Sequence, residues 1–213
     1  MKIIAVGAIP MRARTLFLLI PVILTGCALP LPDKPVRPEP YDLGPALAAP
    51  AATPAGAPLA LDGVESAAAI DSTSVIYRLL YAGSGQQPRP YAHARWTMSP
   101  PQLVTQRLRE ALAATRPVLD TGTGLATLEL RAELDDFSHV FSSPGASEGV
   151  VRLRVTVTAP GARQDRLLGQ RTFAARHAAP TPDAAGGVGA LRAATDEVVR
   201  QVVDWVGSLP APR

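Results

Sequence analysis

Two segments of the chain alternate between apolar and polar residues with a period of two. In the first, Leu128, Leu130 and Leu134 share one face, whereas the residues between them are mostly charged and share the other. Such alternation is typical of half-buried antiparallel strands. A further segment, 72–81, is rich in β-branched and aromatic residues on both faces, which favours a central strand. The strands predicted in this way are 72–81, 91–96, 125–137, 150–158 and 166–176.

Two other segments place apolar residues at helical spacing. The first, 99–115, opens with Ser99 and two prolines, a typical helix start, and its pattern directs Gln106, Arg107 and Glu110 to water. The second opens with Thr181-Pro182-Asp183 and carries a valine-rich stripe. Because valine is a mediocre helix former, we expect this helix to depend on packing against a sheet.

This order of elements predicts one two-layer α/β domain, with a mixed, mostly antiparallel sheet and two helices packed on one face. We place the domain at 59–209, followed by a tail at 210–213. Residues 28–58 contain nine prolines among alanine and glycine, so 27–58 reads as a tether. Fully extended, this tether would reach roughly 95 Å. Within it, Tyr41-Asp42-Leu43 is a candidate edge strand that packs on the domain.

The first 26 residues have the pattern of a signal peptide. Arg12 and Arg14 precede a nine-residue apolar run, 16–24, which is too short to span a bilayer. The next residues, Leu24-Thr25-Gly26-Cys27, resemble the bacterial lipobox, which implies lipid on Cys27 and cleavage before it. Met11 is an alternative start of the chain. The alternative to cleavage is an uncleaved signal anchor in which the cysteine occurs by chance.

Composition removes several other classes of protein. Without residues 1–26 the chain has 18 basic and 18 acidic residues, so it is neutral and a poor candidate for nucleic-acid binding. Cys27 is the only cysteine, which excludes an intrachain disulfide and a multi-cysteine metal site.

The chain resembles the auxiliary lipoproteins of ABC-type transport systems, the family that includes paraquat-inducible protein C. The resemblance rests on the order and spacing of short motifs over most of the mature chain. These motifs are Tyr41-Asp42-Leu43-Gly44, Ile76-Tyr77-Arg78, Tyr91 with Trp96, Pro100-Pro101-Gln102-Leu103, Leu134-Asp135-Asp136-Phe137 with Phe141, Phe173 and Trp205-Val206.

The resemblance implies a non-catalytic component of an MCE-type lipid transport system, without a cofactor. The implied partners are an MCE-family periplasmic protein with its ABC permease and ATPase, and a homo-oligomer is an open alternative. Ala28 after the lipidated cysteine implies the periplasmic face of the outer membrane of a Gram-negative bacterium. The competing interpretation is an envelope assembly lipoprotein that supports an outer-membrane or cell-wall machine.

Aromatic residues are scarce but gather in two short windows. Trp96 and Tyr91 lie in one, and Phe137 and Phe141 in the other. Two interpretations remain open: these side chains pack in the core, or they form a partner-binding surface, where aromatic anchors are favoured. Under the second interpretation the phenylalanines are the best candidates, because we expect them to leave the regular strand.

Catalytic and metal-binding patterns are weak. The histidines occur singly. His139 beside Asp135 and Asp136 is a candidate for a metal ligand or a catalytic base, but the pattern favours a solvated strand end for these acidic residues. No GxSxG motif occurs. The glycines at 186–189 could cradle an anion, but without a following Lys-Ser/Thr pair they indicate a flexible helix entry. We therefore predict no catalytic residue and no metal.

Overall fold

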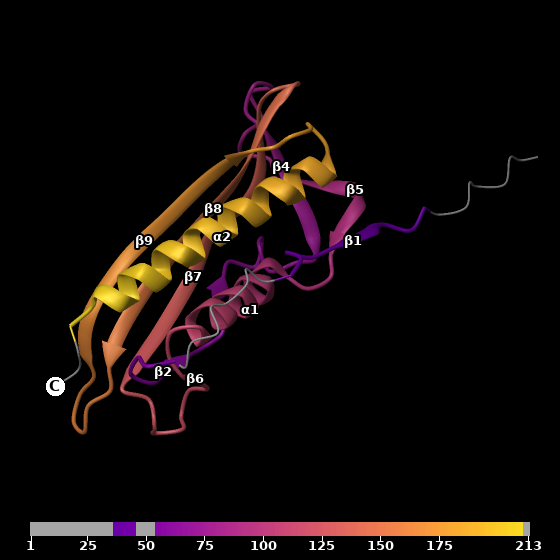
Figure 1. Cartoon of the computed structure of the whole chain (residues 1–213). Helices are drawn as coiled ribbons and strands as arrows, with labels where there is room; N and C mark the ends of the chain where they lie inside the picture. Colours follow the sequence, from indigo (N-terminus) through magenta and orange to yellow (C-terminus); the bar gives the residue numbers. More distant parts are fainter. Residues whose placement is uncertain (1–35, 46–53, 211–213) are drawn as a thin grey trace, which may run out of the picture. The chain divides into compact units, whose positions relative to one another are not determined.

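The computed structural model describes residues 36–45 and 54–210, and residues from Arg37 onward form one compact unit (Figure 1). Its elements are β1 (Glu39–Tyr41), β2 (Leu59–Leu61), β3 (Glu65–Ser66), β4 (Ser74–Leu79), β5 (Arg89–Trp96), α1 (Pro100–Ala113), β6 (Val118–Leu119), β7 (Leu128–Ser143), β8 (Ala146–Ala159), β9 (Arg166–Ala178) and α2 (Ala184–Ser208). All the predicted strands and both predicted helices are present, and β2, β3 and β6 were not predicted. None of the helices in the described ranges is long and apolar enough to cross a membrane.

Strand β7 lies at the centre of the sheet. One of its edges pairs along its whole length with antiparallel β8, which pairs in turn with β9. Its other edge pairs with three short parallel strands placed end to end, β2, β3 and β4. Strands β5 and β1 extend the sheet beyond β4, and β6 extends it beyond β2. Strand β4 is therefore internal, as its two apolar faces predict.

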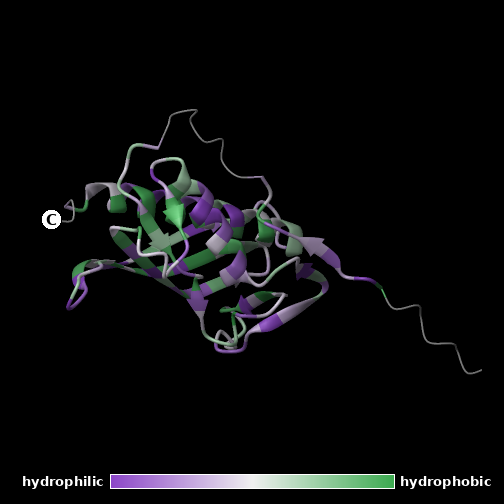
Figure 2. Cartoon of the chain, turned by 90° about the horizontal axis from the view of Figure 1, so that it is seen from below, coloured by the Kyte–Doolittle hydropathy of each residue, from purple (hydrophilic) through white to green (hydrophobic). Residues whose placement is uncertain are grey.

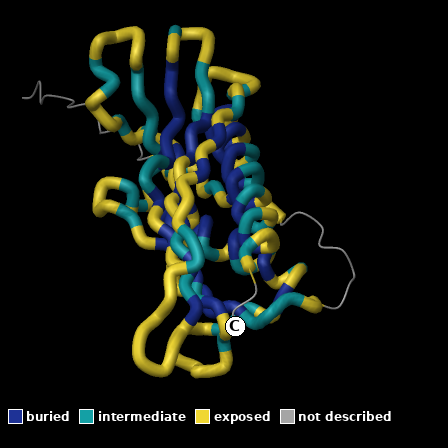
Figure 3. The backbone as a smooth tube through the Cα atoms, turned by 90° about the vertical axis from the view of Figure 1, so that its left-hand side faces the viewer, coloured by how far each residue is buried: buried dark blue, intermediate teal, exposed yellow. Residues whose placement is uncertain are grey.

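Both helices contribute to one hydrophobic core on the same side of the long strands. Helix α2 lies along β8 and β9, and α1 packs against α2 (Figure 1). The core joins Leu130 of β7, Leu108 of α1 and Val198 of α2, each with no exposed surface. Hydrophobic residues follow the strands and the helices in Figure 2, whereas the loops at the ends of the long strands are exposed in Figure 3. The predicted α/β class is confirmed.

An extra residue in β7 changes which side chains face the core. Leu134 pairs with Leu153, but the next pair joins Asp136 to Arg152, so Asp135 is a β-bulge. Even-numbered residues face the core before the bulge and odd-numbered residues face it afterwards. The expectation that Phe137 and Phe141 leave the strand is therefore wrong. Both lie within β7, and the bulge turns their side chains toward the core.

The compact unit begins at Arg37, earlier in the sequence than Leu59, where we expected the domain to start. Residues 39–41 form β1, whose register places Glu39 opposite Ala94 of β5, and Leu43 is buried in the core. The candidate edge strand at Tyr41-Asp42-Leu43 is thus present, shifted by two residues. As a result, only 28–36 separate Cys27 from the folded unit.

Candidate functional site

The four aromatic side chains that were candidates for partner binding are mostly buried. Phe137 and Trp96 are 4% and 3% exposed, and their rings meet edge to face with centroids 5.5 Å apart. Phe141 is 7% exposed, and Tyr91 is half-buried against the core. This burial supports the interpretation that these side chains pack in the core. A direct role in partner binding remains a prediction that would require the core to open.

Strand β7 brings a second aromatic group together around His139. The His139 ring has no exposed surface and lies 4.4 Å from the ring of Phe141, between centroids. Its Nδ1 is hydrogen-bonded to the hydroxyl of Tyr91 at 2.8 Å, and Tyr77 packs on Tyr91. Burial lowers the pKa of His139 to about 4 and raises the pKa of Tyr91. Both groups are therefore neutral at physiological pH.

The glycines at the start of α2 allow the helix to approach this histidine. Gly186 and Gly187 are buried, and a Cβ added to Gly187 would lie 2.3 Å from Nδ1 of His139. The side chain of Asp183 caps the helix by accepting a hydrogen bond from the Gly186 N–H at 2.8 Å, which lowers the pKa of Asp183. The expectation of a flexible helix entry is therefore wrong, because these glycines are required for close packing.

The metal hypothesis for His139 fails on geometry. His139 faces the helices, whereas Asp136 lies on the opposite face of β7, as the alternation after the bulge requires. Within residues 36–45 and 54–210, no group of three His, Cys, Asp or Glu side chains could hold a metal ion. The Nε2 atom of His139 is buried and has no hydrogen-bond partner among the described residues.

A buried arginine fastens the N-terminal segment to both helices. Arg107 of α1 donates hydrogen bonds to the carbonyl oxygens of Leu43, Gly44 and Pro45, and its Nε lies 3.3 Å from Oδ1 of Asp196 in α2. Its side chain is only 5% exposed, so the expectation that Arg107 faces water is wrong. Three carbonyl groups and one carboxylate compensate for burying the charge.

Gly44 completes this junction. Its φ of +65° favours glycine, and an added Cβ would lie 3.2 Å from Nη1 of Arg192. Arg192 also lies 3.9 Å from Asp196, between Nε and Oδ2. The Gly44 N–H donates to the side chain of Asp42 at 2.7 Å, which closes the turn. We call this set, Asp42–Pro45 with Arg107, Arg192 and Asp196, the N-terminal junction.

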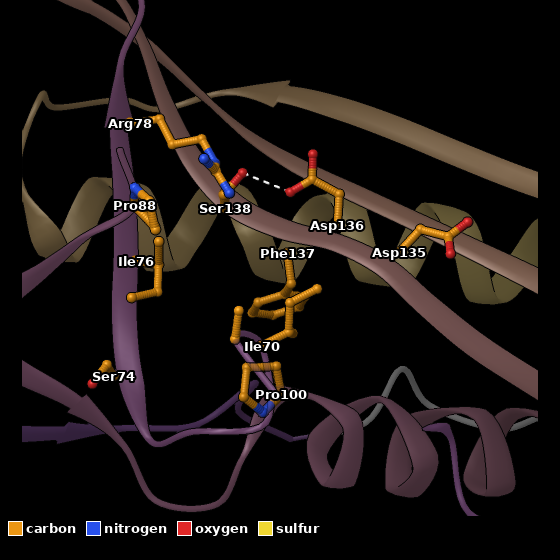
Figure 4. A pocket seen from close by; sticks show the side chains of 11 residues that line it. Ile70, Ser74, Ile76, Arg78, Pro88, Pro100, Asp135, Asp136, Phe137 and Ser138 are labelled. Atoms are coloured by element: carbon orange, nitrogen blue, oxygen red, sulfur yellow. Dashed lines mark hydrogen bonds between the residues drawn. The ribbon is translucent and has the colours of Figure 1, made fainter. Parts of the chain in front are cut away.

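A small hollow lies where the edge of β7 has no partner strand among the described elements. It occupies about 170 Å³ between β4 and the stretch of β7 that separates the pairs with β3 and β4. Figure 4 shows Arg78 extending toward Ser138, whose hydroxyl donates to Asp136 at 2.7 Å. Asp135 beside them is held by Arg154 at 2.8 Å. The hollow is below the roughly 300 Å³ of ordinary ligand pockets, so it does not indicate a substrate site.

Comparison with known proteins identifies the family. The family model for the ABC-type transport auxiliary lipoprotein component matches residues 41–203, which include the N-terminal junction and nearly all of the folded unit. The chain belongs to the ABC-type transport auxiliary lipoprotein family. The resemblance inferred from the sequence motifs is confirmed at this level, and family membership supports a lipoprotein of the bacterial envelope that is associated with a transporter.

Solved structures show the same fold as this auxiliary lipoprotein. A crystal structure of a protein from Xanthomonas campestris matches with a TM-score of 0.67 and 16% identity, covering 79% of this chain and 94% of that chain. A second crystal structure, of an uncharacterised protein, matches with a TM-score of 0.62 and 14% identity, covering 80% of this chain and 99% of that chain. No curated protein matches the chain. These likenesses describe the fold alone.

One structural feature of the auxiliary lipoprotein, the buried position of Arg107, could not be predicted from its sequence. Arg107 sits among Gln106 and Glu110 in the helical pattern, so periodicity alone assigns it to water. No sequence pattern marks its contacts, because the carbonyl groups that it binds belong to residues 43–45, more than 60 positions earlier in the chain. Cys27, the predicted lipidation site, lies outside the described residues.

Proposed function

We propose that this chain is an outer-membrane-anchored, non-catalytic docking component of an MCE-type intermembrane lipid transport system. The observation that carries the proposal is the family match over 41–203 together with a lipobox that ends at Cys27. Acylation of Cys27 would hold the domain at the periplasmic face of the membrane. The domain would then present itself to the MCE protein and its ABC permease and ATPase at high effective concentration.

The N-terminal junction supports this role. A docking component must transmit the position of its anchor to the surface that binds the partner. Arg107 ties the chain that follows the anchor to α1 and, through Asp196, to α2. Helix α2 in turn packs along β8 and β9. Residues 43–45, which follow the proposed anchor in the chain, are thus held on a well-packed unit, which suits positioning.

The test is affinity purification of the acylated protein from separated inner and outer membranes. We expect the protein in the outer-membrane fraction, with the MCE protein, permease and ATPase enriched beside it. Cys27→Ser is the matched control, which should remain unprocessed and lose outer-membrane fractionation. Enrichment of assembly or cell-wall machinery in place of the transporter would refute the proposal in favour of an assembly lipoprotein.

A further inference from the structure

The sheet has a gap beside β3. Strands β2, β3 and β4 pair end to end with one edge of β7. In the next row, β6 pairs with β2 and β5 pairs with β4, but no described strand pairs with the outer edge of β3. An unpaired strand edge can add an extended segment of another chain. The gap is therefore a place where a partner could complete the sheet.

An open groove lies at this gap, between residues 63–66 and α1. It occupies about 740 Å³, which is within the usual range of ligand pockets. Its apolar lining consists of Val64, Met98 and Pro101, of which Met98 is 36% exposed. The hydroxyl of Thr105 on α1 accepts a hydrogen bond from the N–H of Val64 at 2.8 Å and so joins the two walls. The groove is therefore formed in advance of a partner, which lowers the cost of binding.

Acidic side chains border the groove. Residues 59–73 contain three acidic residues and no basic residue. Two of the acidic residues, Glu65 and Asp71, line the groove and are exposed. Neither forms an ion pair with another described residue. These carboxylates are therefore available to a cationic partner.

The basic side chains near the groove are already engaged. Arg109, the only arginine that lines the groove, has its Nη2 3.0 Å from Oδ1 of Asp120. Arg131 of β7 lies close enough to Glu65 to feel its charge, but its side chain donates hydrogen bonds to Glu129. The groove therefore keeps an excess of negative charge, although the mature chain as a whole is neutral.

We propose that this groove docks a basic, extended segment of a protein partner. Lysine and arginine combine an apolar stem with a charged head. The stems pack on Met98 and Val64, the heads pair with the two carboxylates, and the backbone of the segment pairs with the free edge of β3. The inference rests on the proposed function for the source of the segment, which is a protein of the transport system.

The test measures binding of a synthetic peptide to the acylated mature chain in detergent micelles. The probe is a fluorescein-labelled octapeptide of alternating arginine and valine, because valine favours an extended backbone. A peptide of alternating glutamate and valine is the control. Fluorescence anisotropy gives Kd, and amide hydrogen exchange locates the bound peptide. We expect only the basic peptide to bind, with slower exchange in residues 63–66.

Removing the two carboxylates tests the charge of the groove. Glu65→Gln combined with Asp71→Asn should raise the Kd of the basic peptide about tenfold, because two exposed ion pairs are lost. Asp165→Asn combined with Asp204→Asn is the matched control, since it removes two exposed carboxylates outside the groove. This control should keep Kd within about twofold of the parent. Similar losses in both double variants would overturn the inference, since the attraction would then be general.

Replacing the exposed methionine tests the apolar lining. Met98→Gln keeps the length of the side chain but makes its end polar, and it should weaken binding of the basic peptide several-fold. Leu167→Gln, which changes an exposed leucine of β9, should leave Kd unchanged. Full binding by Met98→Gln would overturn the inference. So would slow exchange in 63–66 that depends on protein concentration without peptide, because the occupant would then be a second copy of the chain.

Co-purification separates this inference from the proposed function. The Glu65→Gln, Asp71→Asn variant should stay in the outer-membrane fraction but lose most of the transporter. Full co-purification by this variant would contradict docking in the groove and leave the proposed function intact. Absence of the parent protein from the outer-membrane fraction would contradict the proposed function, whereas the peptide result, which needs no membrane, would stand.

Discussion

Arg107 of α1 and Asp196 of α2 form an ion pair inside the molecule, with Nε and Oδ1 3.3 Å apart. The pair joins the two helices at the point where the N-terminal segment enters the fold, because Arg107 also donates to the carbonyl oxygens of 43–45. Burial raises the pKa of Asp196 despite the neighbouring Arg107 and Arg192. The attraction of the two arginines therefore does not fully offset the cost of burying this carboxylate.

Replacing Arg107 with methionine should release the N-terminal segment. The change keeps the apolar stem but leaves three carbonyl groups without their donor and Asp196 with only the more distant Arg192. Breaking such a buried pair costs about 3 to 5 kcal/mol. Urea unfolding should show this loss, and limited proteolysis should cut earlier within 37–45. Arg109→Met is the matched control, since Arg109 pairs with the exposed Asp120 and should cost under about 1 kcal/mol. Equal losses for both variants would contradict the role of the junction.

Replacing either of two glycines near the start of α2 with alanine should change the stability in opposite directions. Gly187→Ala places a Cβ 2.3 Å from Nδ1 of His139, and overpacking of this kind costs about 1 to 3 kcal/mol. Gly189→Ala meets nothing within 4 Å and lies in the same helix, where alanine is preferred by about 0.5 to 1 kcal/mol. Thermal unfolding should therefore rank Gly189→Ala above the parent and Gly187→Ala below it. A stabilised Gly187→Ala would refute the close approach of α2 to His139.

The hydrophobic pattern of the sequence predicts some elements of this fold and misses others. The sequence pattern predicted β7 and α2. Leu130 and Leu134 belong to a strand pattern with a period of two, and Val198 belongs to a stripe at helical spacing. The pattern missed the bulge at Asp135, since one extra residue shifts the alternation without any compositional mark. It missed β2, β3 and β6, which have two or three residues each and depend on the edges of other strands. It also misjudged Arg107, whose acceptors lie more than 60 residues away.

His139 predicts a pH dependence of stability. In the unfolded chain its pKa is 6.5, and in the folded protein burial lowers it to about 4. Between these values the unfolded state binds the extra proton, so stability rises with pH there and is lost as pH falls from 6.5 toward 4. The shift corresponds to about 3 kcal/mol. Urea unfolding at pH 4, 5, 6 and 7 should show this loss, and His139→Gln, which does not titrate, should flatten the profile relative to the parent.

The buried phenylalanines of β7 give a prediction that separates core packing from partner binding. Phe137→Ala removes a ring that is 4% exposed and packs on Trp96, which should cost about 3 to 5 kcal/mol. Tyr81→Ala removes a ring that is 48% exposed and should leave the free energy of unfolding within about 0.5 kcal/mol of the parent. Chemical unfolding measures both, and co-purification with the transporter is then compared at equal folded concentration. If Phe137→Ala keeps full stability yet loses the partner, the ring is a docking anchor and its place in the core is wrong.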